Sequence, residues 1–313
     1  MKKFLPLFML LALVTLFSSC TETKVTRQSF AFDTVLNITA DEKYNEEISE
    51  AFRMCQGYEK VFSRTNKESE LYKINNKVSV LPSKEIKEVL EFSLDMSKKT
   101  DGAFDVTVAP LVDLWDVNKR TAPPSSEEIE KAKENVGYEN ISSAPFSLGK
   151  ASLDMGAVAK GYIADRLVDY FKEKGADDVI IDLGGNVALV GEHSVGIRNP
   201  KKPDEVFAVI HLKDKSAVTS GAYQRYFDYE GERYHHIIDP RTGYPSDGDI
   251  LSVTVVSPSS MVADALSTSI YILGEDALSL CEEFPHTDAI IIRKDLNTAT
   301  TKGFAEKYSL AYK

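Results

Sequence analysis

The chain has 313 residues, of which 43% are hydrophobic and 27% are charged, the composition of a globular protein able to bury a sizeable core. Its 37 Lys and Arg residues against 48 Asp and Glu residues give a formal net charge of −11 at pH 7. A surface this acidic repels polyphosphate backbones, which argues against nucleic acid as a partner. An anionic ligand must then be bound by local positive charge, from a metal ion, a helix N-terminus or a few lysines.

The N-terminus carries the pattern of an export signal. Two lysines precede the apolar residues 4–17, a run too short to span a bilayer comfortably, and small residues lead into Cys20. This pattern predicts a lipoprotein signal peptide over 1–19, a lipidated Cys20 and a tether over 20–28. The protein is then exported and lipid-anchored to a bacterial membrane, facing the periplasm or the cell exterior. An uncleaved N-terminal anchor is the alternative, and it places the chain on the same side of the membrane.

The first half of the chain is mainly helical in pattern. Apolar residues at helical spacing predict a helix over 44–62, in which Cys55 is a buried small hydrophobe. Ser83 predicts the start of a second helix, and the capping-box spacing of Ser125 and Glu128 predicts the start of a third. The predicted elements are a strand at 29–40, helices at 44–62, 82–102 and 122–137, and a short helical turn within 62–76.

The second half changes to strands. Short apolar runs separated by turn residues predict them, with a hairpin at residues 230–232. The predicted elements are helices at 164–173 and 260–274, two apolar runs within 177–191, and strands at 207–212, 216–221, 225–239, 249–257 and 287–295. With no internal repeat and no linker, the pattern predicts one α+β unit from about residue 28 to 312.

The stretch LDMGAVAKG, residues 153–161, leads into the helix at 164–173. A helix that begins near Gly156 or Ala157 would direct free N–H groups at an anionic ligand, with Lys160 adding a charge in the first turn. The stretch does not match a phosphate loop, because its lysine precedes the second glycine. The alternative is that Asp154 is an ordinary helix cap and that Lys160 is solvated.

Asp264 and Thr268 are four residues apart in the predicted helix at 260–274, so they share a face. A carboxylate and a hydroxyl are hard oxygen ligands that suit Mg²⁺ and suit zinc poorly. The alternative is that Asp264 caps the helix and that Thr268 bonds back to a carbonyl.

Residues 235–245, HHIIDPRTGYP, follow a predicted strand. His236 is a candidate general base and Arg241 a candidate anion contact. His235 faces the opposite way if the segment is extended, so at most one of the two histidines reaches a given site. Ordinary turn chemistry also explains the Asp, Pro and Gly of this segment.

Residues 101–117 hold Asp105, Phe104 and the only tryptophan of the chain, Trp115. Aromatic and aliphatic residues beside small ones suit a planar ligand, and they suit a hydrophobic core at least as well.

Taken together, seven segments resemble, in chain order, the ApbE family, whose members are FAD:protein FMN transferases. The resemblance runs from about residue 29 to 300, and many members of the family are exported lipoproteins, which agrees with Cys20. The segments are GAFDVTVAPLVDLW, LDMGAVAKGYIAD, DLGGN, GIRNP, AVTSGAYQRYF, HHIIDPRTGYP and SVTVVSPSSMVADALSTSIYILG.

The resemblance implies an α+β fold of mixed, largely antiparallel sheets with packed helices, T-fold-like, forming one two-lobed catalytic unit over 29–313. It also implies the reaction: Mg²⁺-dependent cleavage of FAD, transfer of FMN to a Ser or Thr hydroxyl of an acceptor protein, and release of AMP. Membrane electron-transfer subunits in the same compartment are the acceptors that the family implies, and the membrane contact is through the lipid anchor alone.

The resemblance also implies roles for single residues. Magnesium is held by Asp264, Thr268 and the backbone carbonyl of Ala157. His236 takes the proton from the acceptor hydroxyl, and Asp264 is a competing base. The residues that contact FAD are Phe32, Thr65, Ala103, Phe104, Asp105, Asp154, Lys160 and Ile238.

Two departures from the family pattern keep other functions open. Asp33 stands where the family often has a glycine, and Thr65 or Asn66 where many members place a tyrosine on the adenine. Weaker FAD retention makes an FAD pyrophosphatase, which uses water in place of the acceptor hydroxyl, the first alternative. A non-catalytic FAD-binding lipoprotein is the second, although binding alone does not require a base, and a purely structural lipoprotein is the third.

Overall fold

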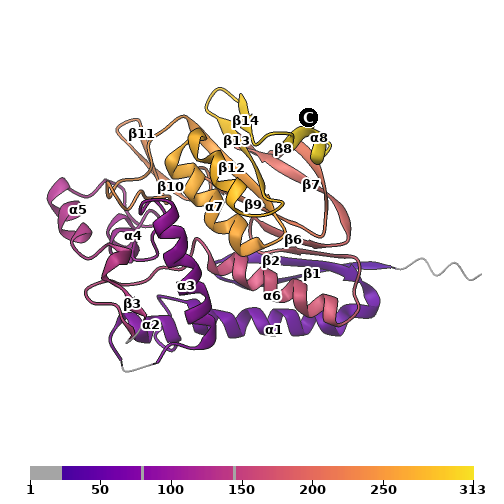
Figure 1. The fold of residues 1–313 in the computed structure, drawn as a ribbon, viewed down its shortest axis with the longest axis horizontal. Coiled ribbons are helices and arrows are strands. Elements are labelled where there is room, and N and C mark those ends of the chain that lie inside the picture. The colour runs from indigo at the N-terminus through magenta and orange to yellow at the C-terminus, as the bar shows by residue number, and fades with distance from the viewer. Residues whose placement is uncertain (1–22, 79–80, 144–145) are drawn as a thin grey trace, which may run out of the picture.

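The computed structural model describes residues 23–78, 81–143 and 146–313. Its centre is an eight-stranded sheet in which every neighbouring pair of strands is antiparallel, in the order β1-β2-β5-β6-β9-β12-β13-β14 (Figure 1). The strands are β1 (Lys24–Ala31), β2 (Thr34–Asp41), β5 (Val179–Asp182), β6 (Asn186–Val190), β9 (Ser216–Gly221), β12 (Ile250–Ser257), β13 (Asp288–Arg293) and β14 (Thr298–Thr300).

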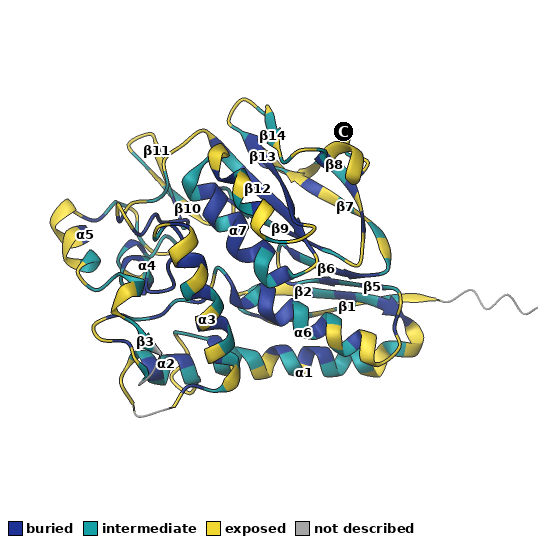
Figure 2. Ribbon diagram, in the orientation of Figure 1, coloured by how far each residue is buried: buried dark blue, intermediate teal, exposed yellow. Residues whose placement is uncertain are grey.

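Three helices cover one face of this sheet: α1 (Asn45–Phe62), α6 (Ala159–Glu173) and α7 (Ser260–Leu273). The main hydrophobic core lies between them and the sheet, and Figure 2 shows that much of α6 and α7 is buried. Every second side chain along a strand points to the same face, and apolar side chains at these positions, such as Val253 and Val255 of β12, fill this core. Among the described residues, no helix combines the length and the apolar character needed to cross a bilayer.

A smaller three-stranded sheet packs on the opposite face, in the order β15-β8-β7, with β7 at one edge. A second core joins the two sheets through residues such as Leu189 and Ile210. The elements of this layer are β7 (Glu192–Asn199), β8 (Lys202–Lys213), α8 (Phe304–Lys307) and β15 (Ala311–Tyr312).

A second lobe, built around residues 108–136 and 227–238, lies beside the end of the main sheet (Figure 1). Its small core surrounds Trp115, which is fully buried, stacks on Tyr234 with ring centroids 5.5 Å apart, and donates from Nε1 to the Gly243 carbonyl at 2.8 Å. The tryptophan is therefore a core residue. The remaining elements are η1 (Glu42–Tyr44), α2 (Glu70–Asn75), α3 (Lys84–Lys99), α4 (Ala109–Trp115), α5 (Ser126–Lys133), η2 (Tyr138–Asn140), β3 (Ser142–Ser143), β4 (Phe146–Ser147), β10 (Tyr226–Tyr229), β11 (Glu232–His235) and η3 (Glu275–Glu283).

The local signals in the sequence hold for most elements. Ser83 accepts a hydrogen bond from the Ile86 N–H at the start of α3, and the capping box of Ser125 and Glu128 begins α5. Cys55 is buried in α1, as predicted. Cys281 is also free and buried.

Two predictions about the N-terminal region are wrong. The single strand predicted at 29–40 is a hairpin of β1 and β2, because Phe32 and Asp33 take the left-handed backbone conformation (φ 55° and 57°) and turn the chain. Residues 24–28, predicted as tether, pair with β2 as the first part of β1. The predicted signal peptide at 1–19 and the lipidated Cys20 lie outside the described residues.

Candidate functional site

A cavity of about 1550 Å³ lies where the end of the main sheet meets the second lobe. Its lining comes from segments more than two hundred residues apart in the sequence. Every residue to which the family resemblance assigns a role, and which lies in the described part of the chain, lines it. These residues are Phe32, Thr65, Ala103, Phe104, Asp105, Asp154, Ala157, Lys160, His236, Ile238, Asp264 and Thr268.

The cavity has two arms, one on each face of the main sheet. Ser220 of β9 bonds to Thr268 of α7 at 3.2 Å, so this residue faces the helices. Thr219, the next residue along the strand, faces the other way and bonds to Thr254 at 2.8 Å. We call the first side the helix arm, lined by Asp154, Lys160, Ser220, Asp264 and Thr268, and the second the sheet arm, lined by Ile180, Val187, Leu189, Ala217, Thr219, Thr254 and the β7 residues 194–198.

In the helix arm, α7 presents Asp264 and Thr268. Asp264 is buried and its Oδ2 accepts the backbone N–H of Gly161 at 3.0 Å. The alternative that Asp264 caps the helix is wrong, because Ser259 is the cap and accepts the Val262 N–H. The partly buried carboxylate of Asp165 accepts the N–H of Ser260 at 2.6 Å, which fixes the start of α7 against α6.

The opening stretch of α6 differs from its prediction. The helix begins at Ala159 and not near Gly156, because Asp154 Oδ1 accepts the Gly156 N–H at 2.8 Å and holds the preceding residues in a turn. Lys160 lies in the first helical turn as predicted, with Nζ 3.3 Å from the Gly156 carbonyl. The N–H of Gly161 is already bonded to Asp264, so it is not free for a phosphate.

Arg64 is a cavity residue that sequence reasoning missed. Its Nε lies 2.7 Å from Asp154 Oδ2, and it also pairs with Asp113. Burial alone would lower the pKa of this guanidinium, but the two carboxylates outweigh burial and raise it. No sequence signal joins Arg64 to Asp154, because the two are ninety positions apart and meet only through the fold.

His236 lines the cavity and His235 does not, as alternation predicted. His235 is buried against Tyr271 and bonds through Nε2 to the Ser246 carbonyl at 3.0 Å. His236 is half-buried, with Nδ1 3.3 Å from the Arg225 carbonyl. A carbonyl only accepts, so this bond places the ring proton on Nδ1 and leaves Nε2 with a free lone pair.

The two histidines are uncharged at neutral pH. Burial, followed by the nearby Arg225 charge, lowers the pKa of His236 to about 3. Burial also lowers the pKa of His235 to about 4. A neutral imidazole is the form that accepts a proton.

Two predicted contacts have their polar atoms engaged within the protein. Asp105 Oδ1 accepts from the N–H and the hydroxyl of Thr107, both at 2.7 Å, and its Oδ2 accepts the Tyr138 N–H at 2.9 Å. Burial raises the pKa of Asp105. Arg241 forms a two-point ion pair with Asp239 at 2.9 and 2.8 Å and does not line the cavity, so it is not the predicted anion contact.

The first β-hairpin brings Phe32 and Asp33 to the rim of the cavity. The Phe32 N–H donates to Glu59 Oε1 at 2.9 Å. Asp33, which stands where the resemblance expects a glycine, takes a left-handed backbone (φ 57°), the conformation that favours glycine. The turn therefore forms without the glycine.

The donor atoms in the helix arm fit a hard cation. Asp264, Thr268 and the Ala157 carbonyl would supply carboxylate, hydroxyl and carbonyl oxygens, the set that Mg²⁺ prefers. Among the residues that the structure describes, no group of three or more His, Cys, Asp or Glu side chains is placed to hold a metal ion by itself.

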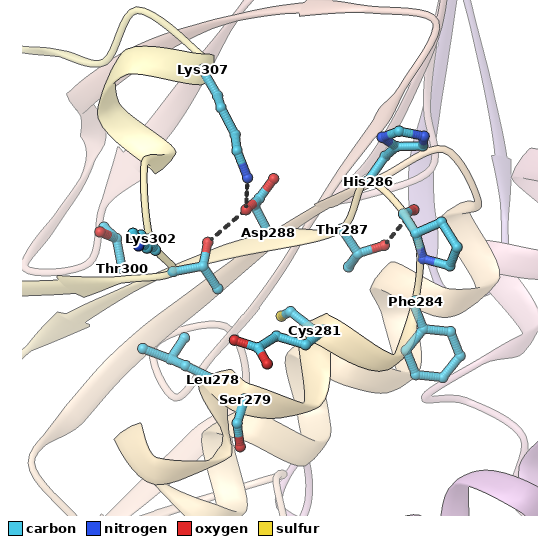
Figure 3. Close-up of a pocket in the computed structure, with 13 residues that line it drawn as sticks. Leu278, Ser279, Cys281, Phe284, His286, Thr287, Asp288, Thr300, Lys302 and Lys307 are labelled. Atoms are coloured by element: carbon cyan, nitrogen blue, oxygen red, sulfur yellow. Dashed lines mark hydrogen bonds and ion pairs between the residues drawn. The ribbon is translucent and has the colours of Figure 1, made fainter.

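A second cavity, of about 670 Å³, lies near the C-terminus and contains none of the predicted site residues (Figure 3). Its buried carboxylate, Asp288, already accepts from Thr301 at 2.9 Å and from Lys307 and Tyr308 at 2.8 Å. Its thiol is buried, and burial raises the pKa of Cys281 to about 12, so it is not a reactive nucleophile. The chemistry of the molecule therefore concentrates in the larger cavity.

Known proteins are similar to this chain in sequence. An FAD:protein FMN transferase of Treponema pallidum (strain Nichols) is 33% identical over 291 residues, 83% of this chain and 80% of the relative. One of Klebsiella pneumoniae (strain 342) is 32% identical over 259 residues, 79% of this chain and 82% of the relative.

Solved structures confirm the predicted fold class. The ApbE protein of Thermotoga maritima superposes with a TM-score of 0.81 at 29% identity, and flavin transferase ApbE of Vibrio cholerae with 0.78 at 26%. Each comparison covers 91% of this chain and 99% of the solved chain. The family model described as ApbE family matches residues 32–291. The chain therefore belongs to the ApbE family.

Proposed function

We propose that this protein transfers FMN from FAD to a Ser or Thr hydroxyl of an acceptor protein, in a reaction that requires Mg²⁺. The observation that carries the proposal is the convergence of a neutral histidine, a buried carboxylate, a hydroxyl and a lysine on one cavity. The relatives named FAD:protein FMN transferase support the same reaction.

The proposed step is a displacement at the phosphorus of the FMN half of FAD. The acceptor oxygen forms a bond to this phosphorus, the bond from phosphorus to the bridging oxygen breaks, and AMP leaves with that oxygen. Nε2 of His236 takes the hydroxyl proton, since Nδ1 is occupied by its bond to Arg225.

The other cavity residues bind and orient FAD. Lys160 and the helix arm face the diphosphate, while Ala103, Phe104 and Ile238 form an apolar wall for the flavin. Asp154 is held by Arg64 and takes part in nucleotide binding from this fixed position. Magnesium bound by Asp264, Thr268 and the Ala157 carbonyl would neutralise charge on the diphosphate.

An FAD pyrophosphatase is the second candidate, and Thr65 favours it. Thr65 and Asn66 line the cavity where an aromatic side chain would stack on adenine, and neither has a stacking face. Water in place of the acceptor hydroxyl would need the same base and the same metal.

The place of action is part of the proposal. The pattern that ends at Cys20 supports export and a lipid anchor. An anchored transferase reaches acceptors at the same membrane surface, which supports a membrane electron-transfer subunit as the partner.

One experiment separates the candidates. The mature protein is incubated with FAD and Mg²⁺, with and without a threonine-containing acceptor peptide, and AMP, FMN and peptide mass are followed. A peptide that gains FMN supports the transferase, and free FMN without peptide supports the hydrolase. FAD that stays intact throughout contradicts both.

A further inference from the structure

The edge of strand β7 forms one wall of the sheet arm. Five consecutive residues, 194–198, line the cavity. Side chains of a strand alternate between its two faces, so five in a row cannot all point into one cavity. Ile197 is buried in the core between the two sheets and Val195 packs against it. The cavity therefore meets the backbone edge of β7.

The backbone direction of β8 shows which edge groups are unpaired. The His211 N–H donates to the Tyr308 carbonyl at 2.9 Å, and the Phe207 carbonyl accepts from the Lys313 N–H at 3.0 Å. Both partners belong to the C-terminal segment that pairs with the far side of β8. Odd-numbered residues of β8 therefore direct their backbone groups toward β15, and even-numbered ones direct theirs toward β7.

The pairing register between β8 and β7 shows which backbone groups of β7 are bonded to β8 and which are not. Ile210 lies opposite Val195, so the N–H and C=O of Val195 are bonded to β8. The N–H and C=O of Ser194 and Gly196 then point away from β8, toward the cavity. Within the described strands, β7 pairs with β8 and with no other, so these groups form a free edge.

The sheet arm is continuous with the proposed reaction centre. Tyr223, Gln224 and Arg225, which follow β9, line the same cavity, and the Arg225 carbonyl bonds to the ring of His236. A chain lying in the sheet arm can thus present a side chain to Nε2 of His236. An unpaired strand edge has one natural occupant, an extended peptide that completes its hydrogen bonds.

We propose that the free edge of β7 binds the acceptor protein as an added strand, with its Ser or Thr hydroxyl presented to His236. The inference rests on the proposed function, because it names how the second substrate of that reaction is held. Main-chain pairing would supply affinity, and the partly exposed apolar side chains of Ile180 and Val187 would contact alternate side chains of the peptide.

The first test compares Gly196→Pro with Gly196→Ala. Proline removes the edge N–H and blocks the strand addition, yet leaves the β8 side of the strand paired. Alanine keeps the N–H, and its Cβ would meet Val206 at an ordinary 3.4 Å. With peptides of a randomised library bearing one central threonine, flavin transfer by the Pro variant is expected to be about tenfold slower than by the Ala variant. Both variants should bind FAD with the same Kd.

The second test methylates the backbone nitrogens of one transferred peptide, one position at a time. Pairing to an edge predicts that transfer falls at alternate positions only, because every second N–H faces β7. Equal transfer by the two Gly196 variants, no alternation along the peptide, or an FAD Kd that changes in the Pro variant would each overturn the docking mode. A wild type that cleaves FAD and labels no peptide would overturn the proposed function and the docking mode together.

Discussion

The backbone N–H of Gly161 in α6 donates to Oδ2 of Asp264 in α7 at 3.0 Å. The two helices come this close because residue 161 has no side chain: a Cβ there would lie 2.4 Å from the Ser260 carbonyl oxygen. The second glycine of the LDMGAVAKG stretch thus serves helix packing, and through packing it orients the carboxylate proposed to bind magnesium.

Gly161→Ala should damage both stability and activity. The added methyl group must displace the α7 backbone, and overpacking of this kind costs about 1–3 kcal/mol of unfolding free energy. Denaturant unfolding measures the loss, and FAD turnover should fall with it. Gly57→Ala is the matched control, since nothing lies within 4 Å of its Cβ in α1, and it should stabilise the protein by about 0.4–1 kcal/mol. Equal stability of the two variants would contradict the packing argument.

Asp264→Ala should abolish metal-dependent turnover, with a loss of at least about a hundredfold, because it removes the one carboxylate of the proposed magnesium site. Magnesium titration of FAD cleavage measures the effect, and EDTA should reproduce it in the wild type. Asp169→Ala, which alters an exposed carboxylate on α6, is the control. Activity that persists in EDTA would show that the metal site is wrong.

His236→Ala should slow FMN transfer by about 10²–10⁴-fold and spare FAD binding, because the acceptor hydroxyl loses its base. Transfer rates and FAD fluorescence quenching separate the two effects. A variant that transfers normally once FAD is saturating, and is defective only in FAD binding, would reassign His236 as a ligand contact.

The buried His235 should make the protein less stable in mild acid. Its pKa is about 4 in the folded state against 6.5 for the free side chain, so the unfolded chain binds more protons between these pH values. Stability is therefore full above pH 6.5 and falls as the pH drops toward 4, by on the order of 3 kcal/mol for this group. His235→Gln should flatten that part of the curve of unfolding free energy against pH. An unchanged slope in the variant would rule out His235 as its source.

Arg64→Ala should weaken FAD binding by about tenfold, because Asp154 loses the ion pair that fixes it at the cavity wall. Calorimetric titration with FAD measures the change. Arg53→Ala breaks an exposed pair with Glu50 on α1 and should leave FAD affinity unchanged. The same affinity in both variants would remove Arg64 from the binding site.

Local chemistry made part of the fold predictable. Side-chain caps such as Ser83 and Ser125 act within one turn of their own helix, so their sequence spacing was sufficient. The turn at Phe32 and Asp33 was missed because neither residue is a glycine, although both adopt the backbone that favours one.

The candidate site, too, could be predicted from the sequence only in part. The positions of Asp264 and His236 could be predicted from helical spacing, strand alternation and the family resemblance. The pairing of Arg64 with Asp154 and the free edge of β7 could not, because each depends on contacts between distant parts of the chain.

The most direct test of the proposed reaction is the mass of a threonine-containing acceptor peptide after incubation with FAD and Mg²⁺ in oxygen-18 water. Attack by the threonine oxygen on the FMN phosphorus predicts a peptide that carries FMN without the heavy isotope, together with AMP. Free FMN with oxygen-18 in its phosphate, and an unmodified peptide, would contradict the transferase and identify the protein as a hydrolase.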